Sequence, residues 1–327
     1  MNKEITMNKK SSIFKNQTFK DFAPSIIIII VLIIAGELAT PGFAKVNNIF
    51  NIMTRASILT IACIGQAFVM ISGNAGIDLS VGAIMSMACL VGPMLTGGTN
   101  GGILIAILAF IGIGIVIGTI SGVCIQYLRI PALVMTLAMS AIVNGLTLGL
   151  TRGQPTMTMP KLLLDLGLPC LGPVRLMTIV AIVILVLLLL VLHKTKYGRS
   201  LFMVGSNRNA ARLTGLRVNL IVIIAYIISA IMAGIAGLML VGYVGSAQLN
   251  MADEYTMLSV AAVVIGGTKL SGGKGNLVGG ALGAMVLFLL TSILTALGLP
   301  DGVRELIQGA LLLAVILINS REAKLRA

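Results

Sequence analysis

The stretch LMTIVAIVILVLLLLVLHKTKYGRSLFMVGSNRNAARLTGLRVNLIVIIAYII, residues 176–228, places two long apolar runs on either side of a basic segment. That segment, 194–217, carries six Lys and Arg residues and no acidic residue. A run of about 20 apolar residues is long enough to cross a hydrocarbon core of about 30 Å as a helix, whose backbone hydrogen bonds are all internal. The stretch therefore predicts two membrane helices joined by a basic loop.

The same pattern recurs along the chain. Of its 327 residues, 57% are hydrophobic and 10% are charged, whereas soluble domains carry about 25% charged residues. We therefore expect an all-α polytopic membrane protein with about ten transmembrane helices. One candidate, 252–268, is short enough to be a re-entrant segment. The candidate spans are 24–40, 47–72, 77–95, 102–127, 131–150, 174–193, 218–241, 252–268, 277–299 and 303–319.

The distribution of basic residues predicts the orientation. With ten spans and a cytoplasmic N-terminus, 17 of the 23 Lys and Arg residues fall in cytoplasmic segments and four fall outside. Such a bias is typical of cytoplasmic loops. The predicted organisation is a cytoplasmic basic segment over 1–23, a transmembrane domain over 24–320 that includes the cytoplasmic loop 194–217, and a cytoplasmic tail over 321–327. A cleaved signal peptide is the alternative for the N-terminal segment.

Composition excludes several classes of function. The net charge is +13, but aromatic residues make up only 4% and Trp is absent, which argues against nucleic-acid binding. The basic excess instead favours contact with anionic membrane lipid. Four cysteines and one histidine form no metal-binding pattern, and no catalytic motif is present. We expect no metal, no cofactor and no enzymatic activity in this chain.

The basic segment contains a predicted short helix, SNRNAARLTG, residues 206–215. Ser206 is suited to cap its start, and Gly215 suits the left-handed residue that ends it. A helix this short is unstable alone in water, so we expect it to pack on a cytoplasmic partner. A helix lying on anionic headgroups is the alternative. The predicted contact residues are Ser206, Asn207, Arg208, Asn209, Ala210, Ala211, Arg212, Leu213, Thr214 and Gly215.

A second polar feature is SGNAGIDLSVGAIMSM, residues 72–87. A buried carboxylate is costly within a membrane and is often functional there, so Asp78 is a candidate for the solute pathway. We expect the main role of Asp78 to be capping the helix that follows it, with contact to the pathway as an additional role. The predicted pathway residues are Gln66, Asn74, Asp78, Ser80 and Asn144.

The third feature is the glycine-rich stretch GGTKLSGGKGN, residues 266–276. It does not match a phosphate-binding loop. Its LSGGK, residues 270–274, is close to the signature of transporter ATPases, but no soluble stretch is long enough for an ATPase domain. A tight turn between two spans explains the stretch better. The predicted structural glycines are Gly266, Gly267, Gly272, Gly273 and Gly275.

Five stretches together resemble one family. They are GIDLSVGA (76–83), IPALVMTLAMSAIVNGLTLGLTRGQPT (130–156), YGRSLFMVGSNRNAARLTGLRV (197–218), AGIAGLML (233–240) and AAVVIGGTKLSGGKGNLVGGALGA (261–284). They are similar to the permease subunits of ATP-binding-cassette (ABC) importers of the ribose, xylose and galactoside type, which are related to autoinducer-2 and branched-chain amino acid permeases. The resemblance covers the chain from about residue 25.

The resemblance implies a multi-pass subunit of the bacterial inner membrane that moves a monosaccharide or a related small polar solute by alternating access. It implies a second permease chain, identical or different, and an extracytoplasmic sugar-binding protein. ATP and Mg²⁺ would bind a separate cytoplasmic ATPase, which residues 206–215 would contact as a coupling helix.

Two departures from the family pattern leave the solute open. The family commonly has YELDAIAA where this chain reads YTMLSVAA, residues 255–262, and many relatives have Arg at the position of Asn144. Permeases for autoinducer-2, nucleosides or branched-chain amino acids are therefore alternatives. A gradient-driven carrier is a further alternative, although few intramembrane ionisable residues are available for it.

Overall fold

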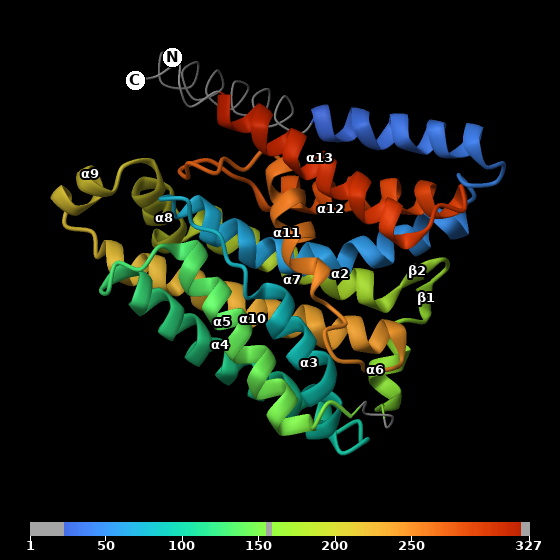
Figure 1. Cartoon of the computed structure of the whole chain (residues 1–327), viewed down its shortest axis with the longest axis horizontal. Coiled ribbons are helices and arrows are strands. Elements are labelled where there is room, and N and C mark those ends of the chain that lie inside the picture. The colour runs from blue at the N-terminus through green and yellow to red at the C-terminus, as the bar shows by residue number, and fades with distance from the viewer. Residues whose placement is uncertain (1–22, 155–158, 322–327) are drawn as a thin grey trace, which may run out of the picture.

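The computed structural model describes residues 23–154 and 159–321. The predicted terminal segments 1–23 and 321–327 lie outside this part of the chain except for Ala23 and Arg321. The elements are a first helix over Ala23–Ala39, then α2 (Val46–Ile71), α3 (Val81–Thr96), α4 (Gly102–Gln126), α5 (Ala132–Thr151), α6 (Lys161–Asp165), β1 (Pro169–Leu171), β2 (Val174–Arg175), α7 (Leu176–Lys194), α8 (Lys196–Ser206), α9 (Arg208–Leu213), α10 (Val218–Val244), α11 (Glu254–Ile265), α12 (Leu277–Ala296) and α13 (Asp301–Arg321), as shown in Figure 1.

Each of the ten predicted spans coincides with a helix. In the described part of the chain, six helices are long and apolar enough to cross a membrane, namely α2, α4, α5, α7, α10 and α12. Three others, Ala23–Ala39, α3 and α11, are shorter apolar helices. With 12 residues, α11 rises only about 18 Å, which is less than a hydrocarbon core of about 30 Å. The fold is therefore that of an all-α polytopic membrane protein.

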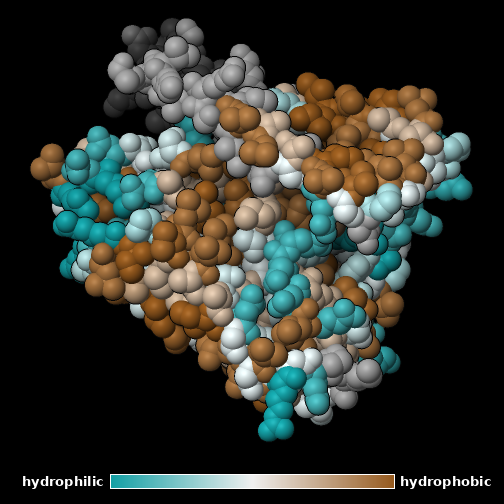
Figure 2. All heavy atoms as spheres, viewed as in Figure 1, coloured by the Kyte–Doolittle hydropathy of each residue, from teal (hydrophilic) through white to brown (hydrophobic). Residues whose placement is uncertain are grey.

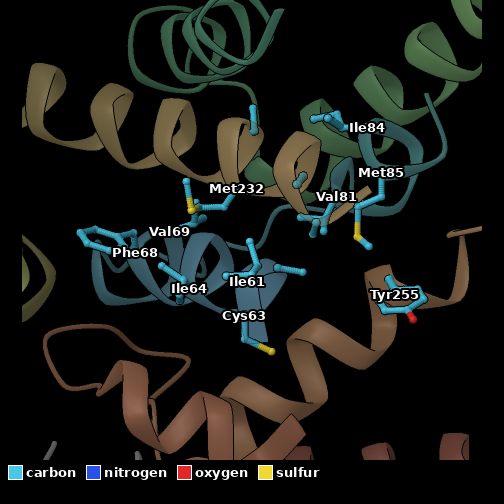
Figure 3. Packing of buried hydrophobic residues seen from close by; sticks show 14 of the residues in the cluster. Ile61, Cys63, Ile64, Phe68, Val69, Val81, Ile84, Met85, Met232 and Tyr255 are labelled. Atoms are coloured by element: carbon cyan, nitrogen blue, oxygen red, sulfur yellow. The ribbon is translucent and has the colours of Figure 1, made fainter. Parts of the chain in front are cut away.

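Helices α2 and α10 form the centre of the molecule. The most apolar part of α2 is 89% buried, against 22% for α7, because α2 packs on α7, α10, α11 and α12. Figure 3 shows Phe68 and Val69 of α2 beside Met232 of α10. Lipid is as apolar as these side chains, so close van der Waals packing, rather than removal from water, holds the helices together.

A row of small residues brings α4 against α10. Gly114, Gly118 and Gly122 recur every four residues and so share one face of α4. A Cβ added to Gly118 would overlap the backbone of Ile227 on α10, and one added to Gly122 would lie 2.8 Å from the Cα of Ile223. Such small-residue rows let two membrane helices approach closely.

The outward faces of α4, α5 and α7 are apolar. Leu104, Leu137 and Leu187 are among their exposed side chains. In Figure 2, brown spheres cover much of the lower left face, where α4 and α5 lie. An exposed apolar surface on helices of membrane length fits contact with lipid or with another membrane helix.

The two ends of the molecule differ in character. Figure 1 places α8 and α9 at the left end and α6, β1 and β2 at the right end, and Figure 2 shows hydrophilic residues gathered over α8 and α9. At the right end, the antiparallel pair of β1 and β2 carries an exposed cysteine, Cys170. The other cysteines are Cys63 and Cys89, which are buried, and Cys124, which is partly buried.

Candidate functional site

The basic loop between α7 and α10 is helical over most of its length. The sequence predicted one helix there, but α8 precedes α9 and was missed. Thr195 caps α8 by accepting a hydrogen bond from the backbone N of Gly198 at 3.3 Å. Leu201 and Val204 on one face of α8 are buried. Helix α8 therefore packs on the membrane domain and provides a platform for α9.

The predicted cap at Ser206 is wrong. Ser206 ends α8, where its hydroxyl donates to the carbonyl of Phe202 at 2.8 Å. Asn207 caps α9 instead, because its extended backbone aims the side-chain oxygen at the backbone N of Ala210, 3.0 Å away.

The C-terminal end of α9 is closed by a Schellman motif. The backbone N of Gly215 donates to the carbonyl of Arg212 at 3.0 Å, and that of Leu216 donates to the carbonyl of Ala211 at 3.2 Å. Gly215 has a φ of +81° and so occupies the left-handed position predicted for it. Caps at both ends hold this six-residue helix in shape.

Helix α9 presents a small mixed surface to its surroundings. Ala211 is buried, so it is not part of the exposed apolar patch expected from the sequence. Leu213 is 90% exposed, the largest exposure among the large apolar side chains of the described residues. The remaining exposed residues of the predicted contact are Ser206, Asn207, Asn209, Ala210, Arg212, Thr214 and Gly215.

Arg208 points toward the membrane domain rather than away from it. One guanidinium nitrogen lies 3.4 Å from the carbonyl oxygen of Ser72 and 3.3 Å from that of Gly73, and another lies 3.5 Å from Oε1 of Gln126. Burial, together with the nearby charge of Arg212, lowers the pKa of Arg208. Arg208 therefore fixes α9 to the turn that follows α2.

Four glycines lie beneath α9 where three segments meet. We call Gly73, Gly205, Gly272 and Gly273 the glycine junction. A Cβ on Gly205 would overlap the carbonyl oxygen of Ile71, and one on Gly272 would overlap the Cα of Gly73. The backbone N of Gly273 donates to the carbonyl of Ile71 at 3.0 Å. The end of α2, the end of α8 and the turn before α12 thus touch through their backbones.

The predicted glycine turn separates into two roles. Gly267, Gly272 and Gly273 have φ values of +86°, +87° and +70°, which L side chains rarely adopt. The φ values of Gly266 and Gly275 are not positive. These two glycines allow close packing instead, since a Cβ on Gly266 would overlap Gly279 of α12 and one on Gly275 would lie 2.7 Å from Cγ1 of Ile71.

Three of the predicted pathway residues form one buried network. The carboxylate of Asp78 accepts hydrogen bonds from the backbone N of Ser80 at 3.0 Å and from its hydroxyl at 2.6 Å. The other carboxylate oxygen accepts from the hydroxyl of Ser229 on α10 at 2.7 Å. With its side-chain O and N assigned from their neighbours, Gln66 donates to the carbonyl of Asp78 at 3.1 Å and accepts from its backbone N at 3.2 Å. Because Asp78 is only 2% exposed, this network joins α2, α3 and α10 rather than lining an open pathway.

The other two predicted pathway residues lie elsewhere. Asn74 is exposed beside α9 and has a φ of +60°. Asn144 is on α5, where its Oδ1 is buried and accepts no hydrogen bond from the described residues. The structure therefore does not bring the five predicted pathway residues together.

A polar pocket at the opposite end was not predicted from the sequence. This cavity of about 340 Å³ lies at the start of α2, and at 1.5 Å per residue Arg55 is roughly 24 Å along the axis from the end of α2. We call it the polar pocket. Its polar lining residues are Asn48, Asn51, Arg55, Arg175, Tyr243 and Ser292, with Thr295.

The polar pocket is held by contacts between distant segments. Arg55 donates to the hydroxyl of Tyr243 at 3.1 Å, and Arg175 donates to Oδ1 of Asn51 at 2.7 Å. The guanidinium of Arg175 also lies 5.7 Å from the centre of the Tyr243 ring. Periodicity cannot indicate a pairing of residues 188 apart. The available signal was Arg55 itself, because a charged residue within a span often marks a functional site.

These features define a multi-pass membrane protein with a small capped helix at one end and a polar pocket at the other. The chain belongs to the family described as the branched-chain amino acid transport system permease component, whose model matches residues 48–316. This match confirms that the chain is a permease subunit, a multi-pass protein of the bacterial inner membrane, as the five stretches predicted.

Individual relatives agree along nearly the whole chain. The ribose import permease protein RbsC of Escherichia coli strain K12 is 34% identical over 304 residues, which cover 91% of this chain and 93% of the relative. RbsC of Bacillus subtilis strain 168 is 31% identical, covering 90% and 91%. The autoinducer 2 import system permease protein LsrC of Escherichia coli strain SMS-3-5 is 30% identical, covering 93% and 88%. No solved structure gives a significant match.

Proposed function

We propose that this chain is the permease subunit of an ABC importer for ribose or a closely related monosaccharide. The name of its relative RbsC, a ribose import permease, supports a pentose as the solute. LsrC imports autoinducer 2, a small polar solute, so that molecule is the second candidate. In both cases the solute crosses by alternating access between two conformations of the membrane domain.

Energy comes from ATP and Mg²⁺ on a separate cytoplasmic ATPase, and α9 is the coupling helix. The observation that carries this proposal is the exposure of Leu213, at 90%, on a helix capped at both ends. Covering an exposed Leu side chain with a partner removes its apolar surface from water, which contributes about 1.5–3 kcal/mol. A helix lying on lipid would instead need a broad apolar face, which α9 lacks because Ala211 is buried.

The glycine junction supports the transmission of a movement of α9 to the membrane domain. Arg208 joins α9 to the turn after α2, and Gly205 at the end of α8 touches both Ile71 and Gly273. Contacts between backbones leave no flexible side chain to absorb a displacement. A shift of α9 therefore moves the end of α2 and the turn before α12 together.

The polar pocket is the proposed first contact of the solute with the membrane domain. Amide, hydroxyl and guanidinium groups that line a cavity can bond to sugar hydroxyls. Its position at the far end of α2 from α9 fits a pathway that runs along α2. The buried network of Asp78 then belongs to the structure that supports the pathway.

The proposed assembly contains further subunits. The proposed topology has ten membrane crossings and both termini in the cytoplasm, with residues 245–253 completing the crossing that contains α11. In this topology α9 lies inside and the polar pocket lies outside. The outward apolar faces of α4, α5 and α7 offer a surface for a second permease chain. An extracytoplasmic binding protein would deliver the sugar to the end that carries the polar pocket, α6, β1 and β2.

The coupling role is tested with Leu213→Asp and a matched control, Leu171→Asp. Leu171 is also exposed, at 67%, but lies in β1 at the opposite end. A charge in an interface centre costs about 2 kcal/mol or more, which is about thirtyfold in affinity. We expect Leu213→Asp to prevent co-purification of the ATPase and uptake of labelled ribose, while Leu171→Asp retains ATPase binding.

The outcomes separate the alternatives. Equal ATPase binding by Leu213→Asp and the unmodified chain would contradict the coupling role of α9. Loss of ATPase binding in Leu171→Asp alone would place the ATPase at the other end of the molecule. Ribose uptake by the chain alone in liposomes, without ATPase or nucleotide, would establish a gradient-driven carrier instead.

A further inference from the structure

A second cavity lies beside α9 and is separate from the polar pocket. It has a volume of about 470 Å³ and lies between the α4–α5 turn, the turn after α2 and the helix α9. The lining residues that matter here are Asn74, Gln126, Arg129, Leu133, Arg208 and Arg212. We call it the arginine pocket.

The arginine pocket is strongly cationic. Three of its lining residues are Arg129, Arg208 and Arg212, and none is Asp or Glu. They come from α9 and from the α4–α5 turn, segments far apart in the sequence. Arg129 has a φ of +56°, a conformation that is uncommon for a residue with a Cβ. Three like charges around one cavity repel one another unless an anion offsets them.

Two hydrogen-bond donors at this cavity are left without partners. Nε of Arg208 and Nε2 of Gln126 are buried and bond to no acceptor among the described residues. The remaining guanidinium nitrogens of Arg208 make only long bonds of 3.3 to 3.5 Å. Buried donors without partners are uncommon in folded proteins because each costs about 1–3 kcal/mol. The positive charge of the three lining arginines favours a ligand that is negatively charged and accepts hydrogen bonds.

One side of the cavity is apolar and faces outward. Leu133 lines it and is 47% exposed, and the α4–α5 turn next to it presents Tyr127 at 64% and Leu128 at 67% exposure. A free inorganic anion gains nothing from such a surface. An amphiphile with an anionic head and an alkyl tail gains from both parts.

From this juxtaposition we propose that the arginine pocket binds the phosphate group of an anionic phospholipid, whose acyl chain lies over Leu133. Guanidinium groups bind phosphate oxygens through pairs of charge-assisted hydrogen bonds. The bound phosphate would connect the α4–α5 turn to Arg212 of α9 and so hold α9 in place. Lipid binding itself does not depend on the proposed ATPase or sugar, so the two proposals are tested separately.

The test uses the purified full-length chain in detergent and native mass spectrometry with phosphatidylglycerol or phosphatidylcholine. The variant is Arg129→Gln with Arg212→Gln, both exposed positions, while Arg208 is kept because it fixes α9. The control is Lys196→Gln with Arg199→Gln, exposed residues of α8 that remove the same charge outside the pocket. A second variant, Arg129→Lys with Arg212→Lys, keeps the charge but loses the paired geometry.

We expect phosphatidylglycerol to bind the Gln variant about thirtyfold more weakly, since each of the two lost guanidinium–phosphate contacts contributes about fivefold. The Lys variant should fall between, and the control should bind as the unmodified chain does. Equal loss in the variant and the control, or equal retention of phosphatidylcholine and phosphatidylglycerol, would overturn the proposal. Suppose that millimolar inorganic phosphate displaced the lipid and stabilised the folded chain as much as the lipid does. The ligand of the arginine pocket would then be free phosphate and not a phospholipid.

Discussion

Single residues indicate whether the centre of this permease lines the solute pathway or stabilises the fold. Asp78 was open to both interpretations in the sequence, as a helix cap or as a pathway residue. Its contacts favour support. The hydroxyls of Ser80 and Ser229 and the backbone N of Ser80 donate to its carboxylate, which belongs to a residue only 2% exposed, and Gln66 pairs with its backbone. A carboxylate that accepts several hydrogen bonds is stable away from water.

The supporting role predicts a difference between two substitutions of Asp78. Asp78→Asn keeps the shape and an acceptor for Ser80, so we expect a cost of about 1 kcal/mol. Asp78→Leu leaves the hydroxyls of Ser80 and Ser229 without an acceptor, so we expect a cost of about 3 kcal/mol or more. Thermal unfolding of the purified chain in detergent measures both. Normal stability of Asp78→Asn together with complete loss of uptake would instead assign the charge a role in transport.

At the same scale, the cap of α9 shows how closely residue types predict local structure. Ser and Asn both cap helices well, and the sequence offered both in succession. Asn207 is the cap because α8 extends through Ser206, whose hydroxyl donates to a carbonyl within α8. The sequence therefore placed the helix correctly and the cap one residue early, since the length of α8 depends on its packing against the membrane domain.

At the scale of helices, hydropathy predicted the membrane helices, whereas the amphipathic pattern did not reveal α8. Long apolar runs identify membrane helices because lipid leaves the backbone no other way to satisfy its hydrogen bonds. Helix α8 was missed because its buried face is short, with only Gly198, Leu201 and Val204 buried, and because basic residues such as Lys196 and Arg199 occupy its other faces. The contact of α4 with α10 is visible in the sequence as glycines spaced by four, but the partner helix is not.

This contact predicts a strong difference between two glycines of α4. In Gly118→Val the new side chain would overlap the backbone of Ile227, so we expect a loss of about 1–3 kcal/mol from overpacking. Gly112 lies on the same helix with no atom within 4 Å of an added Cβ, so Gly112→Val is the matched control. Thermal unfolding in detergent should separate the two, with a lower midpoint only for Gly118→Val. Equal midpoints would show that α4 and α10 do not pack through this face.

At the scale of the whole molecule, segments with predicted cytoplasmic positions meet at one end. The turn after α2 contacts Arg208 of α9, the glycine turn bonds to Ile71, and Arg129 lines the arginine pocket with α9. Charge counting predicted that these segments share a side, but not that they touch. The polar pocket was missed for the related reason that its residues converge only once α2, α7 and α10 are packed.

The orientation predicts how Cys170 behaves. A membrane-impermeant maleimide added to intact spheroplasts should label this exposed thiol in β1, because β1 lies at the end opposite α9. Cys63 and Cys89 are buried and should not react in the folded chain. Cys170→Ser is the control and should abolish labelling. Labelling that requires permeabilised membranes would reverse the proposed orientation.

The exposed thiol in β1 also gives the protein a built-in attachment point for a spectroscopic probe. A fluorophore at Cys170 would sit at the mouth of the permease after replacement of Cys124 alone, which is partly buried, because packing already protects Cys63 and Cys89. A change in its emission when sugar arrives, or when nucleotide binds at the far end, would time the two halves of the transport cycle in one chain.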